Sequence, residues 1–374
     1  LLKDLGRTHE IHYDVVGFID DDRTKKGREI QGVRVLDRCA AIPQLVRLLR
    51  IELILIAVPS ANAEAMRSIV DYCEKAAIPF RTLPKVQDIL DGAASSADLR
   101  SVELDDLLGR DPVSLDWGTM AGMIKGRRIL ITGGAGSIGS ELCRQVARLE
   151  PAEITLFEQN EFNLYSLALE LEERFSSVKF RRLLGDVCDQ KSVGYVFKKY
   201  RPQIVFHAAA YKHVPMLEAQ LRETIKNNTV GTMVTADAAV RTGVERFILI
   251  STDKAVNPTS MMGVSKRLAE MVAQLNNAKS TTAFITVRFG NVLGSAGSVV
   301  PLFERQIRAG GPVTVTDPMM TRYFMTISEA CQLILQACAI GKGGEIFVLN
   351  MGEPVKIDYL ARQTTRLSGK RPDE

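Results

Sequence analysis

The chain has 374 residues, of which 46% are hydrophobic and 25% are charged, a balance typical of soluble globular proteins and, at this length, of two domains. The formal net charge of +4 is small and dispersed, so it gives no support for a nucleic-acid partner. No window is apolar over the length that a transmembrane helix needs, so no membrane span is predicted within these residues.

The first 95 residues alternate strand and helix signals and predict a small α/β Rossmann-like domain. Its own glycine loop is absent, so we expect the domain to be truncated at its start, and a structural or regulatory role is the default for it. Strands are predicted at 15–19, 53–58 and 79–83, and helices at 43–49 and 63–76.

A second unit, 127–374, follows residues 96–126, where few apolar positions are periodic and a linker is predicted. Parallel strands with crossover helices predict a doubly wound Rossmann sheet. Beyond Gly290 we expect loops and helices that form a C-terminal substrate lobe, truncated at its end. The six strands of the sheet are predicted at 128–132, 153–157, 179–184, 203–207, 246–251 and 283–287.

Three glycines, Gly133, Gly136 and Gly139, lie between the strand at 128–132 and a helical pattern. Glycine allows a tight turn there, lets backbone N–H groups approach a pyrophosphate, and lets the helix pack close to the strand. The positive end of the helix then faces the phosphates. A turn without a ligand is the alternative, but the position between strand and helix favours a dinucleotide site that includes Ser137 and Ile138.

The strand at 153–157 is followed by Glu158, whose carboxylate can accept both ribose hydroxyls of NAD and would repel a 2′-phosphate. Gln159 follows instead of an arginine, so NAD is favoured over NADP, although an acid at a strand end is often simply solvated. Further along, we expect Asp186 and Val187 to lie near the adenine, and the small residues Ala208, Ala209 and Ala210 to leave room for the cofactor. Asn228 is expected near the nicotinamide, with an ordinary position at a helix start as the alternative.

The strand at 246–251 runs into Thr252, Asp253 and Lys254. Ligands bind at the carboxyl ends of strands in open α/β sheets, so these side chains should face the nicotinamide. A surface ion pair between Asp253 and Lys254 is the alternative. A helix carrying Met262 and Lys266 follows.

Together, these residues resemble the extended short-chain dehydrogenases/reductases, whose helix usually carries Tyr-x-x-x-Lys. Met262 stands here in the tyrosine position, and with Thr-Asp-Lys this is similar to one branch, the bacterial UDP-N-acetylglucosamine 4,6-dehydratases of surface-polysaccharide and glycan synthesis. The resemblance covers nearly the whole chain. Other matching stretches are 107–113, 207–215, 288–295, 320–326 and 350–355.

The resemblance implies a reaction in three stages: oxidation of the sugar at C4, elimination of water across C5 and C6, and return of the hydride to C6. By position, Lys254 would be the base at C5 and Asp253 the acid for the departing hydroxyl. Thr252 would hydrogen-bond the C4 oxygen, and Lys266 would hold the nicotinamide ribose. Met262 leaves open what takes the C4 hydroxyl proton; Asp253 and a water held by Thr252 are candidates, and Met262 can also be a packing residue.

For the substrate, the resemblance places Asn291 and Arg322 at the diphosphate, and an arginine fork suits phosphate oxygens. Ser298 and Val299 would lie near the uridine, and Lys212 beside the sugar or the cofactor phosphates. Surface or packing roles are the alternatives for each of these positions.

The resemblance therefore implies an NAD-dependent dehydratase that acts on UDP-N-acetylglucosamine and keeps the C5 configuration. It also implies a homo-oligomer and, upstream of Leu1, a membrane segment that holds the full-length protein at the cytoplasmic face of the bacterial inner membrane. Two alternatives stay open: a nucleotide-sugar 4-epimerase, and a catalytically inactive nucleotide-sugar-binding regulator. The six cysteines show no metal or redox spacing, so we expect reduced packing residues and no metal site.

Overall fold

The structure, a computed structural model, describes residues 13–58, 61–84, 99–108, 115–370 and 372. The chain divides into two compact units, one of Leu1–Asp111 with Gln363–Glu374 and one of Pro112–Arg362. Between residues 96 and 126, where the sequence predicts a linker, the structure has two helices, α5 (Leu104–Leu108) and α6 (Trp117–Ile124). Leu107, Met120 and Ile124 of these helices are buried.

The first unit is a small α/β structure, as predicted. Strands β1 and β3 pair in parallel, as do β4 and β5, and the helices bury Val70 and Cys73 beside Ile56 of β4. The antiparallel pairing of β2 and β3 was not predicted. Its two-residue loop, Gln31 and Gly32, has positive φ angles of 51° and 82°, which suit a tight hairpin turn. The elements are β1 (Phe18–Ile19), β2 (Glu29–Ile30), β3 (Val33–Asp37), a 3-10 turn (Cys39–Ala41), α2 (Ile42–Leu49), β4 (Ile54–Ile56), α3 (Ala63–Ala76) and β5 (Phe80–Thr82).

The second unit is built on a parallel sheet with the strand order β15-β11-β10-β9-β6-β7-β8. The predicted Rossmann fold is therefore confirmed. Its strands are β6 (Arg128–Thr132), β7 (Glu153–Glu158), β8 (Phe180–Leu184), β9 (Ile204–His207), β10 (Arg246–Thr252), β11 (Ala283–Phe289) and β15 (Ile346–Val348).

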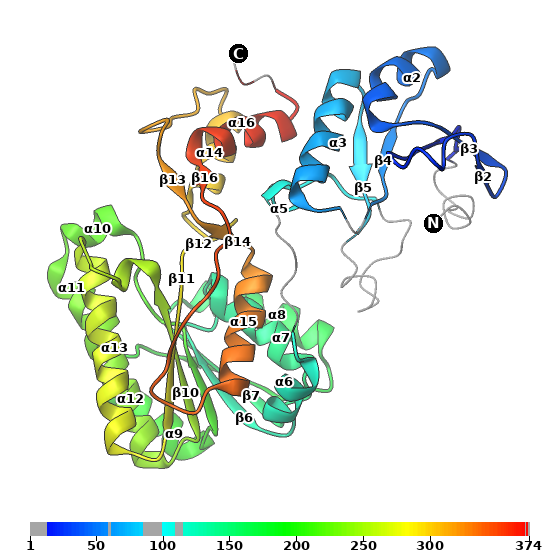
Figure 1. Cartoon of the computed structure of the whole chain (residues 1–374). Helices are drawn as coiled ribbons and strands as arrows, with labels where there is room; N and C mark the ends of the chain where they lie inside the picture. The colour runs from blue at the N-terminus through cyan, green and yellow to red at the C-terminus, as the bar shows by residue number, and fades with distance from the viewer. Residues whose placement is uncertain (1–12, 59–60, 85–98, 109–114, 371, 373–374) are drawn as a thin grey trace. The chain divides into compact units, whose positions relative to one another are not determined.

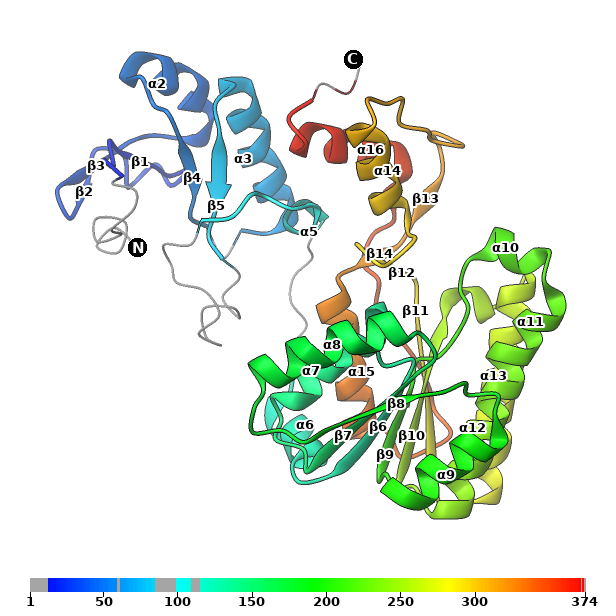
Figure 2. The ribbon, with the colours of Figure 1, turned by 180° about the vertical axis from the view of Figure 1, so that it is seen from behind.

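Helices cover both faces of this sheet (Figures 1 and 2). One apolar core joins the sheet to α6, α7, α8 and α15, and a second joins it to α9, α12 and α13. Two cores on opposite faces explain why most strand residues are apolar instead of alternating with polar ones. These helices are α7 (Ser137–Ala147), α8 (Glu161–Arg174), α9 (Gln190–Tyr200), α12 (Gly231–Thr242), α13 (Met261–Lys279) and α15 (Ile327–Ile340).

The prediction that everything beyond Gly290 forms a substrate lobe is wrong for two elements. Helix α15 packs on α6 and α7 with Cys331, Ile334 and Cys338 fully buried, and β15 is a seventh strand, which pairs with β11. The chain thus returns to the sheet after leaving it. The nearly continuous apolar sequence of α15 is the pattern of a buried helix and could have indicated this.

Two short helices between β9 and α12, α10 (Val214–Glu218) and α11 (Leu221–Ile225), pack on α13. The elements after β11 other than α15 and β15 form the smaller lobe. There β12 pairs with β14 in parallel and β13 pairs with β16 in antiparallel orientation. Among the described residues, no helix is both long and apolar enough to cross a membrane. The lobe elements are β12 (Asn291–Val292), α14 (Val299–Arg308), β13 (Thr321–Arg322), β14 (Phe324–Met325), β16 (Val355–Lys356) and α16 (Ile357–Leu367).

Candidate functional site

A cleft opens at the carboxyl ends of strands β6 to β9. It lies where the strand order reverses, between β6 and β9, which is the usual ligand position in doubly wound sheets. Most of its lining comes from the ends of these four strands and the loops that follow them. The lining residues are Gly133, Gly136, Phe157, Glu158, Gln159, Gly185, Val187, Ala208, Ala209, Ala210 and Asn227.

The glycine loop at the cleft has no room for larger residues. Gly133 has a φ of +64°, and a Cβ on it would lie 2.7 Å from the backbone nitrogen and Cα of Ala209. A Cβ on Gly139 would overlap the carbonyl oxygen of Gly133. Gly136 is the N-cap of α7, so free N–H groups and the positive end of the helix meet at the cleft. This cradle fits the pyrophosphate of a dinucleotide.

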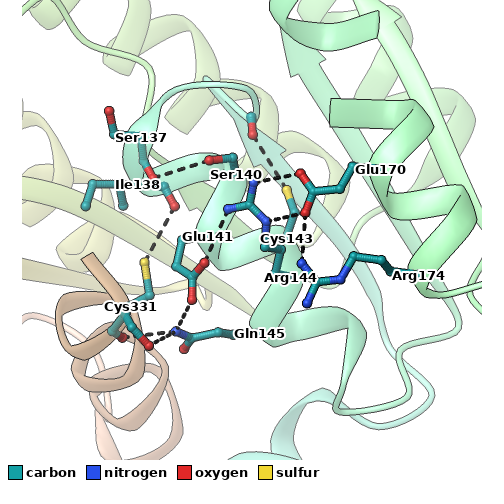
Figure 3. A network of polar contacts seen from close by, with 12 residues as sticks. Ser137, Ile138, Ser140, Glu141, Cys143, Arg144, Gln145, Glu170, Arg174 and Cys331 are labelled. Carbon is teal, nitrogen blue, oxygen red and sulfur yellow. Dashed lines mark hydrogen bonds and ion pairs between the residues drawn. The ribbon is translucent and has the colours of Figure 1, made fainter. Parts of the chain in front are cut away.

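Polar contacts fix α7 behind this loop, as Figure 3 shows. Arg144 makes a two-pronged ion pair with Glu170 of α8, with Nε–Oε1 at 2.6 Å and Nη2–Oε2 at 2.8 Å. Gln145 donates to the carbonyl of Ser328 on α15 (3.0 Å), and the Cys331 thiol donates to the carbonyl of Ile138 (3.6 Å). The helix that carries the phosphate cradle is therefore held from both neighbouring helices.

Glu158 reaches back to the glycine loop. Its Oε2 accepts from the backbone N–H of Ala135 (3.2 Å), and its Oε1 accepts from Gln159 (2.9 Å) and Asn160 (3.0 Å). These bonds fix a carboxylate at the rim of the cleft, where a ribose would lie. The carboxylate of Asp186 also bonds to the backbone: its Oδ1 accepts from the N–H of Cys188 (2.8 Å).

Asn228 lies in a π-helical turn, Lys226–Val230, but its side chain is fully buried and bound to protein. Its Oδ1 accepts from the N–H of Tyr211 (2.8 Å), and its Nδ2 donates to the carbonyl of Tyr211 and to Ser265 Oγ (both 3.0 Å). It thus fixes the loop after β9 to α13. Its neighbour Asn227 lines the cleft instead, as do Phe157 and Gly185, which sequence reasoning missed.

His207 lies fully buried under the cleft and holds β6, β9 and α12 together. The hydroxyl of Thr232 donates to the carbonyl of Asn228 (2.7 Å), so its oxygen must accept from His207 Nε2 (3.0 Å). Nδ1 then accepts from the hydroxyl of Thr132 (2.7 Å). Burial, with a smaller contribution from the charge of Lys266, lowers the pKa of His207 to about 3, so the imidazole is neutral.

Strand β10 ends in a compact polar cluster. Thr252 closes the strand, and Asp253 and Lys254 begin a 3-10 turn. Lys254 Nζ lies 3.0 Å from Asp253 Oδ1, and the hydroxyl of Thr252 donates to the same oxygen (2.8 Å). Both charged side chains are partly exposed, so an acid and a base stand together and accessible at a strand end.

Helix α13 packs closely against this turn, because Gly263 leaves room for the carbonyl of Lys254. Its Lys266 is only 4% exposed and donates to the carbonyl of Ile250 (2.7 Å). Burial lowers the pKa of Lys266 to about 8, and the carboxylate of Glu270 opposes this shift. Met262 is 5% exposed, so it packs in the interior one turn before Lys266.

The lobe brings one predicted substrate residue to the cluster: Asn291 Oδ1 lies 3.2 Å from Lys254 Nζ. Arg322 is exposed, and its Nη1 donates to the carbonyl of Thr321 (2.8 Å). The loop before α14 contacts the start of α7, because the N–H of Ala296 donates to Ser137 Oγ (3.1 Å).

The other predicted substrate residues lie around these contacts. Ser298 occupies the N-cap position of α14 without a side-chain capping bond, and its buried hydroxyl has no partner among the described residues. Val299 is the first residue of that helix. Lys212 is exposed to solvent, although partial desolvation by the surrounding chain lowers its pKa. Within the described ranges, no group of three or more His, Cys, Asp or Glu side chains could hold a metal ion.

Comparison with known families agrees with this architecture. A model described as "Polysaccharide biosynthesis protein" matches residues 129–374, and one described as "CoA-binding domain" matches residues 1–84. The solved structure of Pen from Bacillus thuringiensis is 33% identical, with a TM-score of 0.62, over 66% of this chain and 76% of that one.

Two curated proteins match over both units. The capsular polysaccharide biosynthesis protein CapD of Staphylococcus aureus is 45% identical over 377 residues, covering 100% of this chain and 63% of CapD. The probable polysaccharide biosynthesis protein EpsC of Bacillus subtilis is 47% identical over 355 residues, covering 95% of this chain and 59% of EpsC. The chain thus spans about three fifths of the length of these relatives. With a family model matched across its whole sheet and lobe, the chain belongs to the polysaccharide biosynthesis protein family and has the fold of the extended short-chain dehydrogenases/reductases.

Proposed function

We propose that this protein is an NAD-dependent 4,6-dehydratase that removes water from UDP-N-acetylglucosamine for the synthesis of a surface polysaccharide or glycan. The observation that carries the proposal is the contact between Asp253 and Lys254 at the end of β10. Dehydration needs an acid and a base on neighbouring sugar carbons. Lys266 of α13 donates to the carbonyl of Ile250 on the same strand, and the dinucleotide cradle opens at the same edge of the sheet.

The residues of the cleft fit NAD. The glycine loop and the start of α7 would hold the pyrophosphate, and Glu158 would accept from the ribose hydroxyls. A carboxylate fixed by three backbone N–H groups would repel the 2′-phosphate of NADP, which favours NAD. When bound, NAD supplies the oxidation of C4 and the later reduction of C6.

The protein side chains perform the proton transfers. Once C4 is a ketone, the C5–H bond is acidic, and the neutral amine of Lys254 takes that proton while the electron pair stays on C5 as an enolate. The enolate electrons form the C5–C6 double bond as the C6–O bond breaks, and Asp253 gives a proton to the leaving hydroxyl, which departs as water. Once C6 is reduced, the ammonium group of Lys254 gives a proton back to C5, which restores the neutral base. Thr252, which donates to Asp253, stands beside the C4 oxygen in this arrangement.

Lys266 supports the reaction through its charge. Its buried ammonium group would hold the nicotinamide ribose, and its positive charge would favour loss of the proton from the C4 hydroxyl. The burial of Met262 supports a packing role for this residue. The C4 hydroxyl proton would then go to Asp253 or to a water held by Thr252.

A nucleotide-sugar 4-epimerase shares the fold but needs no acid–base pair beside C5 and C6, and an inactive regulator needs no accessible one. One assay separates the three functions: incubation with UDP-N-acetylglucosamine in deuterated water, followed by mass analysis. Loss of water with uptake of one deuterium at C5 supports dehydration. An unchanged mass with a new configuration identifies an epimerase, and no product identifies the regulator.

Two variants test the assigned roles. Lys254→Ala is expected to abolish the product while the cofactor stays bound, because the base is lost and the cradle is intact. Asp253→Asn keeps the shape of the side chain without the acid, so turnover should fall as well. Full activity in either variant would remove that residue from its role.

The wider setting of the protein is proposed on the resemblance alone. We propose a homo-oligomer, and a longer natural chain that a membrane segment holds at the cytoplasmic face of the bacterial inner membrane. Cross-linking and fractionation of the full-length protein would test both, and a monomer recovered only from the soluble fraction would contradict them.

A further inference from the structure

We propose that Asn291 is a positioning residue for the base: together with Asp253 it aims the lone pair of Lys254 at the substrate. The sequence predicts a contact with the diphosphate for Asn291, and the structure places its side chain on the lysine instead, with Oδ1 3.2 Å from Nζ. This inference depends on the proposed function, because it assigns Lys254 the removal of the C5 proton.

The backbone holds Asn291 in place on its own strand. The N–H of Asn291 donates to the carbonyl of Tyr323 (3.1 Å), as part of the pairing of β12 with β14. The preceding N–H, of Gly290, donates to the sulfur of Met351 (3.3 Å). With its backbone bound to two other segments of the lobe, Asn291 presents its side chain from a fixed point.

The number of acceptors matches the chemistry of a lysine base. A neutral amine has two N–H bonds and one lone pair, whereas an ammonium group has three N–H bonds. Asp253 Oδ1 at 3.0 Å and Asn291 Oδ1 at 3.2 Å can take both N–H bonds of the neutral form. The lone pair then has one remaining tetrahedral direction, away from both oxygens. With Asp253 alone, the amine could rotate and the lone pair would have no fixed direction.

An amide suits this position better than a carboxylate. The contact requires Oδ1 to face the lysine, since Nδ2 would set two donors against each other. An amide oxygen orients the amine without adding a negative charge, whereas a second carboxylate would favour the protonated form, which cannot act as a base. Asn291 therefore adds direction, while Asp253 supplies the acid.

Two substitutions test this role with UDP-N-acetylglucosamine. Asn291→Leu keeps a similar volume and removes the acceptor, and Asn291→Ala removes the whole amide. Because misplacing a catalytic group by about 1 Å can cost about a hundredfold, we expect kcat to fall by about ten- to a hundredfold. KM and the Kd for UDP, measured by calorimetry, should change by less than about twofold.

An isotope effect distinguishes a positioning role from a purely structural one. If C5 deprotonation is slowed, substrate deuterated at C5 should show a larger isotope effect on kcat in the variants than in the wild type. Arg322→Ala, at a proposed diphosphate contact, is the contrasting variant and should raise KM and the Kd for UDP without raising the isotope effect.

Either of two results would overturn the inference: a rise in KM and in the Kd for UDP at unchanged kcat, or a lower kcat with no increase in the isotope effect. Melting temperatures identify which of the two variants is folded. If neither folds, Asn291→Ser replaces them, because it keeps an oxygen acceptor on a shorter side chain. Its kcat should fall less, again with a larger isotope effect. Failure of the proposed function would be seen separately, as the absence of dehydration by the wild type.

Discussion

Lys266 and Glu270 lie one turn apart on α13, and both are almost fully buried, at 4% and 0% exposure. Burial alone would raise the pKa of Glu270, but hydrogen bonds from Arg288, Ser251 and Arg267 outweigh it and hold the pKa below its ordinary value. An ionised carboxylate thus lies beside a lysine whose pKa burial has lowered to about 8. Glu270 keeps the positive charge of Lys266 from being lost at still lower pH.

Replacing Glu270 should therefore move the alkaline limit of activity. In Glu270→Gln the carboxylate charge is gone, so the pKa of Lys266 falls below about 8 and activity is lost at a lower pH than in the wild type. The measurement is kcat/KM against pH for both proteins. Glu304→Gln, on the largely exposed ion pair of α14, is the control and should not move the limit. An unmoved limit in Glu270→Gln would contradict the role of this pair.

The same pair links pH to stability with a defined sign. An unfolded lysine titrates near pH 10.5 and the buried one near 8, so between these values the unfolded chain binds a proton that the native protein lacks. The contribution of Lys266 to the free energy of unfolding therefore rises with pH across this window. In Glu270→Gln, the contribution of Lys266 to the free energy of unfolding should begin to rise at a lower pH.

The glycine loop gives a prediction about cofactor binding. A Cβ on Gly139 would overlap the carbonyl of Gly133, so Gly139→Ala must push α7 away from the loop or reshape the cradle. We expect the Kd for NAD, measured by calorimetry, to rise by at least about tenfold, equivalent to roughly 1.4 kcal/mol. Gly122→Ala is the control: nothing lies within 4 Å of its Cβ position on helix α6. NAD binding of Gly139→Ala at the strength of this control would show that close packing of the loop is not needed.

Much of this architecture could be predicted from the sequence, because its signals are local. Strands β6, β7, β9, β10 and β11 are mainly apolar, and the turn after β6 requires glycine at Gly133 and Gly139. The edge strand β15 has three residues, too few for a periodic pattern, and is recognised only when paired with β11. Its place depends on a long-range contact that no local signal encodes.

The same distinction between local signals and long-range contacts applies to the site. Strand ends predict Glu158, Asp253 and Lys254 as site residues, since ligands collect where parallel strands end. Side-chain partners do not follow from such patterns. Asn228 turns out to hold backbone at Tyr211, and Asn291 reaches Lys254 across 37 positions of sequence, because the pairing of β12 with β14 decides where the lobe lies.

The anchoring of α7 predicts a loss of stability. Arg144→Met keeps the apolar stem and removes the guanidinium group from Glu170. Among the described residues, the partly buried Glu170 then keeps Arg174, at 3.2 Å, as its one cationic partner. We expect the free energy of unfolding to fall by about 1–2 kcal/mol, between the values for exposed and buried pairs. Denaturant unfolding measures it, and Arg308→Met, on a largely exposed ion pair, should change little. Equal losses in both variants would show that burial of the pair does not matter.

The stabilisation by the ion pair of Arg144 with Glu170 should also depend on pH. The hydrogen bond from Arg144 lowers the pKa of Glu170, so the stabilisation is present above the ordinary carboxyl pKa and is lost as the pH falls through the lowered value. Arg144→Met should therefore lose less stability on acidification than the wild type. The comparison needs only melting temperatures at neutral and acidic pH.

His207 predicts a second, separable acid effect at a higher pH. An unfolded histidine binds a proton near pH 6.5, but the buried imidazole does so only near pH 3. Below pH 6.5 the unfolded chain therefore holds one proton more than the native protein. The free energy of unfolding should fall by up to about 1.4 kcal/mol per pH unit, or roughly 2 kcal/mol between about pH 7 and 5.

His207→Gln should reduce this dependence although it lowers stability at neutral pH, because a glutamine amide can bridge Thr132 and Thr232 only in part and does not take up a proton. The measurement is the change in melting temperature between about pH 7 and 5 for the wild type, His207→Gln and His213→Gln. His213 is exposed, so its variant should keep the wild-type slope. If His207→Gln also keeps that slope, the imidazole is not held neutral by its burial, and acid sensitivity in this range comes from other groups.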